Sequence, residues 1–137
     1  MPSIFVDSAY YIAVFRPRDQ LHARALAVGS SLARDGMSFV TTDAVLVEFL
    51  SFVARTPAGT RLAAVEFVQD VRTRPALDVV PQTPALFDAA LDLYRRRADK
   101  TYSMVDCISM VVCRQRKIRD VLTADNDFAQ EGFTVLL

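Results

Sequence analysis

The sequence predicts an α/β protein in which a parallel sheet is covered by helices on both faces. Short apolar, β-branched runs alternate along the chain with longer segments of helical periodicity, an alternation typical of parallel sheets. The length of 137 residues suits one domain, so we expect a single domain over residues 1–137. Hydrophobic residues make up 52% of the chain and charged residues 23%, which favours a folded core over a disordered chain.

The first half of the chain predicts two strands and three helices. A helix should end at Gly36, since glycine commonly closes helices, and Thr42 or Asp43 should cap the next one. In chain order the expected elements are a strand at Ser3–Val6, a helix with the apolar face Leu21, Ala25, Val28 and Leu32, a strand at 38–40, a helix over about 44–55, and a helix after Pro57.

The second half predicts three strands, two long helices and a short one. The expected elements are a strand at Leu77–Val80, a helix from about Pro84, a helix over about 103–116, a strand at 121–123, a short helix over 126–130, and a strand at 133–136. The helix from Pro84 should bury the face formed by Phe87, Ala90, Leu91, Tyr94 and Ala98 and expose Asp88, Asp92 and Arg96.

Four acidic residues lie in segments where a charge is unexpected. Asp7 follows the apolar strand Ile4-Phe5-Val6, and Asp125 comes just after the strand at 121–123. Glu48 and Asp106 are the only charged residues in the apolar segments AVLVEFLSFV and MVDCISMVVC, and neither has Arg or Lys three or four residues away. Because an isolated buried carboxylate is unstable, these acids must pair, take up protons or bind metal.

The positions of these acids favour a shared metal site. In an open parallel sheet, ligands bind beyond the carboxyl ends of the strands, where the strand order reverses. Asp7 and Asp125 follow expected strands, and Asp106 lies in the first turn of an expected helix, so we expect them to meet at that edge. Oxygen ligands suit Mg²⁺ or Mn²⁺, which support phosphodiester hydrolysis. Zinc is not expected, since the only histidine is His22 and we expect both cysteines to be buried.

Taken together, these motifs resemble the PIN-domain ribonucleases, and most closely the VapC toxins of toxin–antitoxin pairs. The resemblance rests on FVDSAYYIA, TTDAVLVEFL, SMVDCIS and TADNDF, and on the patterns Asp99-x-x-x-Ser103-x-x-Asp106 and Leu122-Thr123-x-Asp125-x-x-Phe128. It covers nearly the whole chain and implies a three-layer α/β/α sandwich with a mostly parallel sheet of strand order 3-2-1-4-5. It also implies a metal-dependent endoribonuclease that uses Mg²⁺ or Mn²⁺.

The resemblance assigns roles to individual residues. Asp7 and Asp106 would be the main metal ligands, with Glu48 and Asp125 completing the acidic quartet directly or through water. Ser103 and Thr123 would orient carboxylates through their hydroxyls. Asp127 is left open, because it is close to Asp125 but the Thr-x-Asp-x-x-Phe spacing selects Asp125. The family likeness further implies a homodimer and a small antitoxin protein as inhibitor.

The charge balance limits how RNA can bind. Sixteen basic and sixteen acidic residues give a formal charge of zero, so any RNA contact must be local. Arg96, Arg97 and Lys100 precede the segment that leads to Asp106 and are either RNA-backbone contacts or a solvated helix end. The apolar residues 10–15 are either core, a dimer face or a groove for a partner helix.

Other functions fit the sequence less well. The chain lacks the Asp-x-Asp of dehalogenase-type phosphatases after its first strand, the strand-end lysine of response-regulator receivers, and glycine-rich nucleotide motifs. Two alternatives to a toxin remain, namely a PIN-fold binding module and an RNA-processing nuclease. We expect a cytoplasmic protein, because no signal peptide or membrane span is recognisable.

Overall fold

The computed structural model describes residues 2–137 and contains one five-stranded sheet. The strand order is β3-β2-β1-β4-β5 and all four pairings are parallel, which confirms the predicted α/β fold and its strand order. The strands are β1 at Ser3–Val6, β2 at Ser38–Thr42, β3 at Leu77–Val80, β4 at Asp120–Leu122 and β5 at Thr134–Val135.

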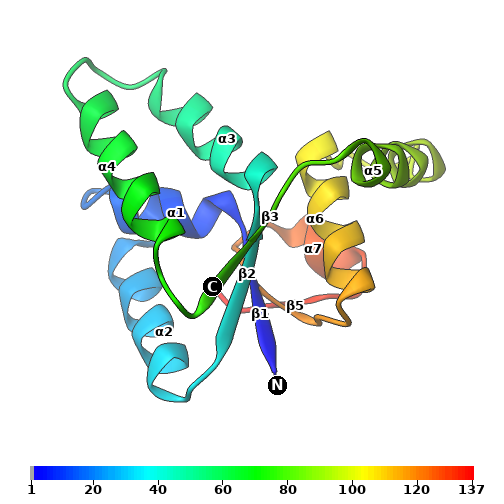
Figure 1. Ribbon diagram of the computed structural model, residues 1–137, viewed down its shortest axis with the longest axis horizontal. Helices are drawn as coiled ribbons and strands as arrows, with labels where there is room; N and C mark the ends of the chain where they lie inside the picture. Colours follow the sequence, from blue (N-terminus) through cyan, green and yellow to red (C-terminus); the bar gives the residue numbers. More distant parts are fainter. Residues whose placement is uncertain (1) are drawn as a thin grey trace.

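Within the described residues, seven helices cover the sheet: α1 at Ser8–Phe15, α2 at His22–Arg34, α3 at Asp43–Val53, α4 at Thr60–Arg72, α5 at Pro84–Arg96, α6 at Met104–Gln115 and α7 at Asn126–Gln130. Figure 1 shows α1, α2 and α4 on one side of the strands and α5, α6 and α7 on the other. The chain builds outward from β1 to β3 and then crosses to β4, so right-handed crossovers place the two groups of helices on opposite faces. The strand order therefore reverses between β1 and β4.

Helix α1 is the element that the sequence prediction missed. Its sequence, SAYYIAVF, is apolar almost all round and follows β1 after a single residue, so no polar face reveals the helical period. Tyr11 and Ala13 are buried in it. At α3 the structure settles the choice of cap, because the Thr42 hydroxyl accepts a hydrogen bond from the backbone N–H of Val45 at 3.1 Å.

The predicted core face of α5 is wrong. Phe87, Leu91 and Tyr94 are 46%, 49% and 50% exposed, whereas Leu86, Ala90 and Leu93 are buried. Of the predicted face only Ala90 is buried, and Ala98 is exposed. Helix α5 carries two adjacent apolar stripes, and packing against α6 decides which of them is buried. The periodicity alone does not distinguish the two stripes.

Aromatic side chains join the helices on one face of the sheet. The ring of Phe49 in α3, which is fully buried, lies 5.3 Å from the ring of Phe15 in α1 and 5.2 Å from that of Phe67 in α4, measured between centroids. Edge-to-face and offset contacts of this kind are the favoured geometries of aromatic pairs. This cluster fixes α3, which carries Glu48, relative to α1, which begins next to Asp7.

Replacing Phe49 with alanine tests this packing. Phe49→Ala removes a ring shared by three helices, so the free energy of unfolding should fall by about 3–5 kcal/mol. Leu62 is the control, because its side chain is 77% exposed on α4 and Leu62→Ala should change that free energy by less than about 0.5 kcal/mol. Urea denaturation measures both. Equal losses for the two variants would contradict the packing described here.

Candidate metal centre

The site begins where β1 and β4 end side by side. Val6 pairs with Leu122 in the parallel register, so the next residues, Asp7 and Thr123, are neighbours. The Thr123 hydroxyl donates a hydrogen bond to Asp7 Oδ2 at 2.8 Å. The other oxygen, Asp7 Oδ1, is buried and has no hydrogen-bond partner among the described residues. Asp7 is the residue before α1 but its side chain does not cap that helix, so Oδ1 receives no hydrogen bond from the helix start either.

Glu48 reaches the site from α3. It is half-buried, and its Oε1 accepts a hydrogen bond from the hydroxyl of Ser8, the first residue of α1. Ser8 was not among the predicted site residues, although it stands next to Asp7 in the sequence. Its hydroxyl links the acid on α3 to the backbone that carries Asp7.

Asp106 lies in the first turn of α6 and is held by a reciprocal cap. The Ser103 hydroxyl accepts from the backbone N–H of Asp106 at 3.0 Å, and the backbone N–H of Ser103 donates to Asp106 Oδ2, also at 3.0 Å. Two helical donors are satisfied in this way. Ser103 therefore fixes the orientation of the carboxylate, which is 8% exposed.

Asp125 and Asp127 come from the start of α7. Asp125 caps this helix, with its Oδ1 accepting from the backbone N–H of Asp127 at 2.9 Å, and its own N–H donates to the Thr123 hydroxyl at 3.1 Å. Carboxylate oxygens of Asp106, Asp125 and Asp127 all lie within 4.8 Å of one another. The structure thus brings Asp127, which the sequence left open, into the cluster. The sequence signal for Asp127 is its spacing from Asp125, because two aspartates two residues apart at the start of a helix lie close together.

Burial and mutual repulsion act on the two central acids. Burial, with the charges of Glu48 and Asp106 adding to it, raises the pKa of Asp7 to about 7, although the Thr123 hydroxyl opposes the rise. Burial, together with the charges of Asp125 and Glu48, raises the pKa of Asp106 to about 6, against the stabilising bonds to Ser103. Both acids therefore hold protons more readily than ordinary aspartates. A cation bound between them would relieve the repulsion among the carboxylates in the same way as the protons do.

The donors present fit a hard divalent cation. The candidate ligands are carboxylate oxygens, and the unpartnered buried Asp7 Oδ1 is the oxygen that such an ion would satisfy. The histidine and the cysteines take no part, because the His22 Nδ1 lies 2.7 Å from the carbonyl of Ala13, and Cys107 and Cys113 are buried free thiols. Mg²⁺ or Mn²⁺ suits such a site better than zinc.

The basic residues near the end of α5 already have acidic partners. Arg96 pairs with Asp92 at 2.9 Å, Arg97 binds both oxygens of Glu131, each at 2.9 Å, and Lys100 lies 3.3 Å from Asp99. The pairs of Arg96 and Lys100 are exposed, where an ion pair contributes little and exchanges easily. Arg97 is the more firmly held of the three, because Glu131 is buried.

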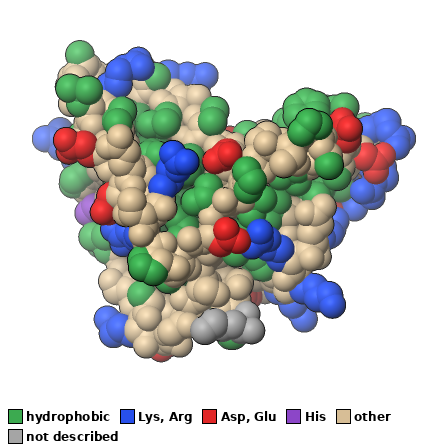
Figure 2. Space-filling model, viewed as in Figure 1, with side chains coloured by type: hydrophobic (Ala, Val, Ile, Leu, Met, Phe, Trp, Pro, Cys, Tyr) green, Lys and Arg blue, Asp and Glu red, His purple; other side chains and the backbone are tan. Residues whose placement is uncertain are grey.

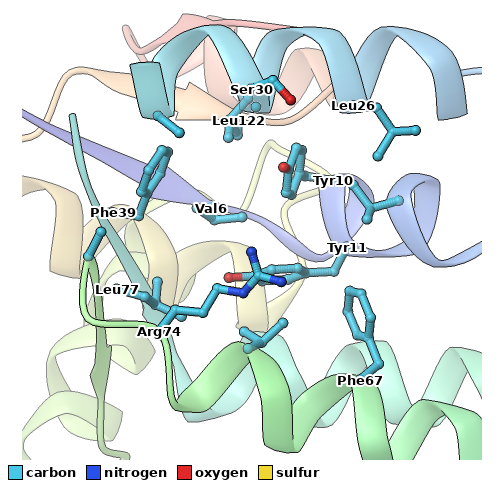
Figure 3. Close-up of a pocket in the computed structure, with 15 residues that line it drawn as sticks. Val6, Tyr10, Tyr11, Leu26, Ser30, Phe39, Phe67, Arg74, Leu77 and Leu122 are labelled. Carbon is cyan, nitrogen blue, oxygen red and sulfur yellow. The ribbon is translucent and has the colours of Figure 1, made fainter. Parts of the chain in front are cut away.

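An apolar groove lies between α1, α2 and α4. Its cavity volume is about 380 Å³, and Val6 and Leu122, the residues just before Asp7 and Thr123, line it. Figure 3 shows Tyr10 and Arg74 turned toward it and Leu26 at its α2 side. None of the acids Asp7, Glu48, Asp106, Asp125 and Asp127 lines this groove. Among the described residues it is therefore a surface distinct from the candidate metal site. Of the apolar residues 10–15, Tyr10, Tyr11 and Val14 line this groove, and Tyr11 is also part of the buried core.

Comparison with known proteins gives consistent matches over nearly the whole chain. The PIN domain family model matches residues 4–133. VapC20 of Mycobacterium tuberculosis, described as a sarcin–ricin loop cleaving toxin, is 27% identical with a TM-score of 0.84, and the match covers 96% of each chain. No curated protein matches the sequence significantly.

Two further structures share the fold at lower identity. FitAcB of Neisseria gonorrhoeae is 18% identical with a TM-score of 0.68, and the match covers 98% of this chain and 96% of that one. VapBC2 of Rickettsia felis, bound to a DNA fragment from its promoter, is 9% identical with a TM-score of 0.68, covering 97% and 96%. The family-model match and the match to VapC20 confirm the resemblance predicted from the sequence, and these two structures agree in fold.

The raised pKa values predict a stability that falls with rising pH. In the unfolded chain the pKa of both aspartates is 3.8, so between about pH 4 and pH 7 the folded protein binds more protons than the unfolded one. The metal-free protein should therefore be less stable at about pH 8 than at about pH 5, and each aspartate should contribute at most about 1.4 kcal/mol for each pH unit between pH 5 and its folded pKa. Urea denaturation in EDTA measures this loss. Asp7→Asn should shrink it, and an unchanged pH dependence in that variant would contradict the coupling.

Proposed function

Because the chain belongs to the PIN-domain family, we propose that it is a metal-dependent endoribonuclease that hydrolyses phosphodiester bonds of RNA. The observation that carries the proposal is the buried carboxylate of Asp7, with Oδ1 unpartnered, beside the raised-pKa carboxyl of Asp106. Such an arrangement destabilises the metal-free protein, and it is accounted for if a cation binds there. The 27% identity to a toxin that cleaves the sarcin–ricin loop supports RNA as the substrate class.

Each side chain has a proposed role in holding Mg²⁺ or Mn²⁺. Asp7 and Asp106 are the main ligands, and Glu48 and Asp125 complete the set directly or through water, with Asp127 as a further carboxylate beside Asp125. A bound ion supplies charge neutralisation at the phosphate and lowers the pKa of water for attack. The hydroxyls of Ser8, Ser103 and Thr123 keep the carboxylates in place, so little reorganisation accompanies binding.

The shape of the molecule supports access of an RNA strand to the edge of the sheet where the acids lie. Figure 2 shows a notch between the part formed by α3 and α4 and the arm formed by α5, with Lys and Arg side chains gathered toward the end of that arm. Arg96 and Lys100, whose ion pairs are exposed, are the proposed contacts to the RNA backbone, with Arg97 behind them. The contacts are sequence-independent, because they address phosphates.

We propose further that the enzyme is the toxin of a VapBC-type pair and acts in the cytoplasm. The likeness to VapC20 supports the toxin role, and the apolar groove of Figure 3 supports a small antitoxin that docks an apolar segment there. The exposed Phe87, Leu91 and Tyr94 on α5 support a homodimer. No helix among residues 2–137 is long and apolar enough to cross a membrane.

RNA cleavage should depend on the divalent ion. We expect the purified protein to cut RNA with Mg²⁺ or Mn²⁺ present, to stop in EDTA, and to recover when Mn²⁺ is restored. Water attack at phosphorus leaves a 5′-phosphate and a 3′-hydroxyl, which end-labelling of the products detects. Cleavage that continues in EDTA, or a 2′,3′-cyclic phosphate on the product, would show a metal-free mechanism. The sarcin–ricin loop is the first RNA to test.

Neutralising the central acids should separate activity from stability. Asp7→Asn and Asp106→Asn each remove a charge that holds the ion, so the cleavage rate should fall at least about a hundredfold. The free energy of unfolding of the metal-free protein at about pH 8 should hold or rise, because repulsion and charge burial are relieved. His22→Ala serves as the control and should keep its activity. A sharp fall in thermal midpoint for both acid variants would instead give these residues a structural role.

A further inference from the structure

The buried carboxylate of Glu131 is the centre of a polar cluster that the proposed chemistry does not use. Its carboxylate is 5% exposed and binds Arg97 through two hydrogen bonds of 2.9 Å. Arg114 of α6 adds an ion pair at 2.8 Å, and the Tyr102 hydroxyl donates to Glu131 Oε1 at 3.1 Å. This is the most densely bonded carboxylate among the described residues. Such bidentate, charge-assisted bonds hold geometry tightly.

The cluster joins the two separate elements that carry the acids of the metal centre. Glu131 directly follows α7, the helix that Asp125 caps and that contains Asp127. Tyr102 directly precedes Ser103, whose backbone N–H and hydroxyl hold Asp106. The hydrogen bond from Tyr102 to Glu131 therefore connects the segment that orients Asp106 with the helix that presents Asp125, and the ion pair from Arg114 of α6 adds a second connection.

Helix α7 needs such an anchor. It has five residues, of which Phe128 alone is buried, and a helix this short is unstable without tertiary contacts. Its acids also face Asp106, since oxygens of Asp106, Asp125 and Asp127 lie within 4.8 Å of one another. Like charges at this distance repel and tend to move α7 away from α6. The contacts of Glu131 with Arg97, Tyr102 and Arg114 oppose that movement.

We propose that Glu131 is a positioning residue that sets the distance between Asp106 and the acids of α7, and thereby the affinity of the site for a divalent cation. The inference rests on the proposed function, because it assumes that these acids bind the ion. In this role Arg97 acts through Glu131, which distinguishes it from Arg96 and Lys100 at the surface. Tyr102 completes the link, since its ring is buried and only its hydroxyl reaches the carboxylate.

The test compares Mn²⁺ binding to the metal-free full-length protein by isothermal titration calorimetry. Glu131→Gln removes the charge that holds Arg97 and Arg114, and Tyr102→Phe removes one hydroxyl while keeping the buried ring. The control is Asp78→Asn, which breaks the ion pair between Asp78 of β3 and Arg116 at the opposite end of α6 from Asp106. Thermal midpoints, and kcat and KM for RNA, are measured on the same samples.

We expect Glu131→Gln to weaken Mn²⁺ binding about tenfold and Tyr102→Phe to weaken it by a smaller factor, with the Asp78→Asn affinity unchanged. Because both residues act on the same distance between Asp106 and the acids of α7, the loss of affinity in the double variant should be smaller than the sum of the two single losses. If both single variants bind Mn²⁺ like the unchanged protein, the positioning role is wrong, whatever their thermal midpoints. Should Glu131→Gln fail to fold, Tyr102→Phe decides. If the unchanged protein binds no Mn²⁺ and cuts no RNA, the proposed function itself is wrong.

Discussion

The concentration of carboxylates at one edge of the sheet is the constraint on which the rest of the structure depends. Asp7 is buried with one oxygen unpartnered, and the charges of Glu48 and Asp106 act on it. An arrangement of this kind lowers stability unless protons or a cation compensate it. The hydrogen bonds of Ser8, Ser103 and Thr123 keep the acids oriented without neutralising them.

The strand order explains how residues far apart in sequence reach the same edge. Because β1 lies at the centre of the sheet, the crossover through α3 brings Glu48 over one side of its carboxyl end and α6 brings Asp106 over the other. Because Val6 pairs with Leu122, the residues that follow them, Asp7 and Thr123, lie next to each other. If that register shifted by one residue, the two side chains would point to opposite faces of the sheet, and Thr123 could no longer donate to Asp7.

Much of this arrangement was predictable, for identifiable reasons. The strand Ser3–Val6 and the acid after it are visible because strand ends and isolated charges in apolar segments are local signals. Helix α1 and the buried face of α5 were not predictable, because an apolar helix and a helix with two apolar stripes leave the choice to packing. Glu131 was missed for a similar reason. Nothing in its neighbourhood in the sequence shows that Arg97, Tyr102 and Arg114 surround it.

The central claim is that the acids at this edge form a binding site for a divalent cation. A crystal structure of the protein soaked with Mn²⁺, measured at a wavelength where manganese scatters anomalously, tests this most directly. We expect one strong anomalous peak in contact with Asp7 Oδ1 and a carboxylate oxygen of Asp106. The absence of a peak there at saturating Mn²⁺ would contradict the claim.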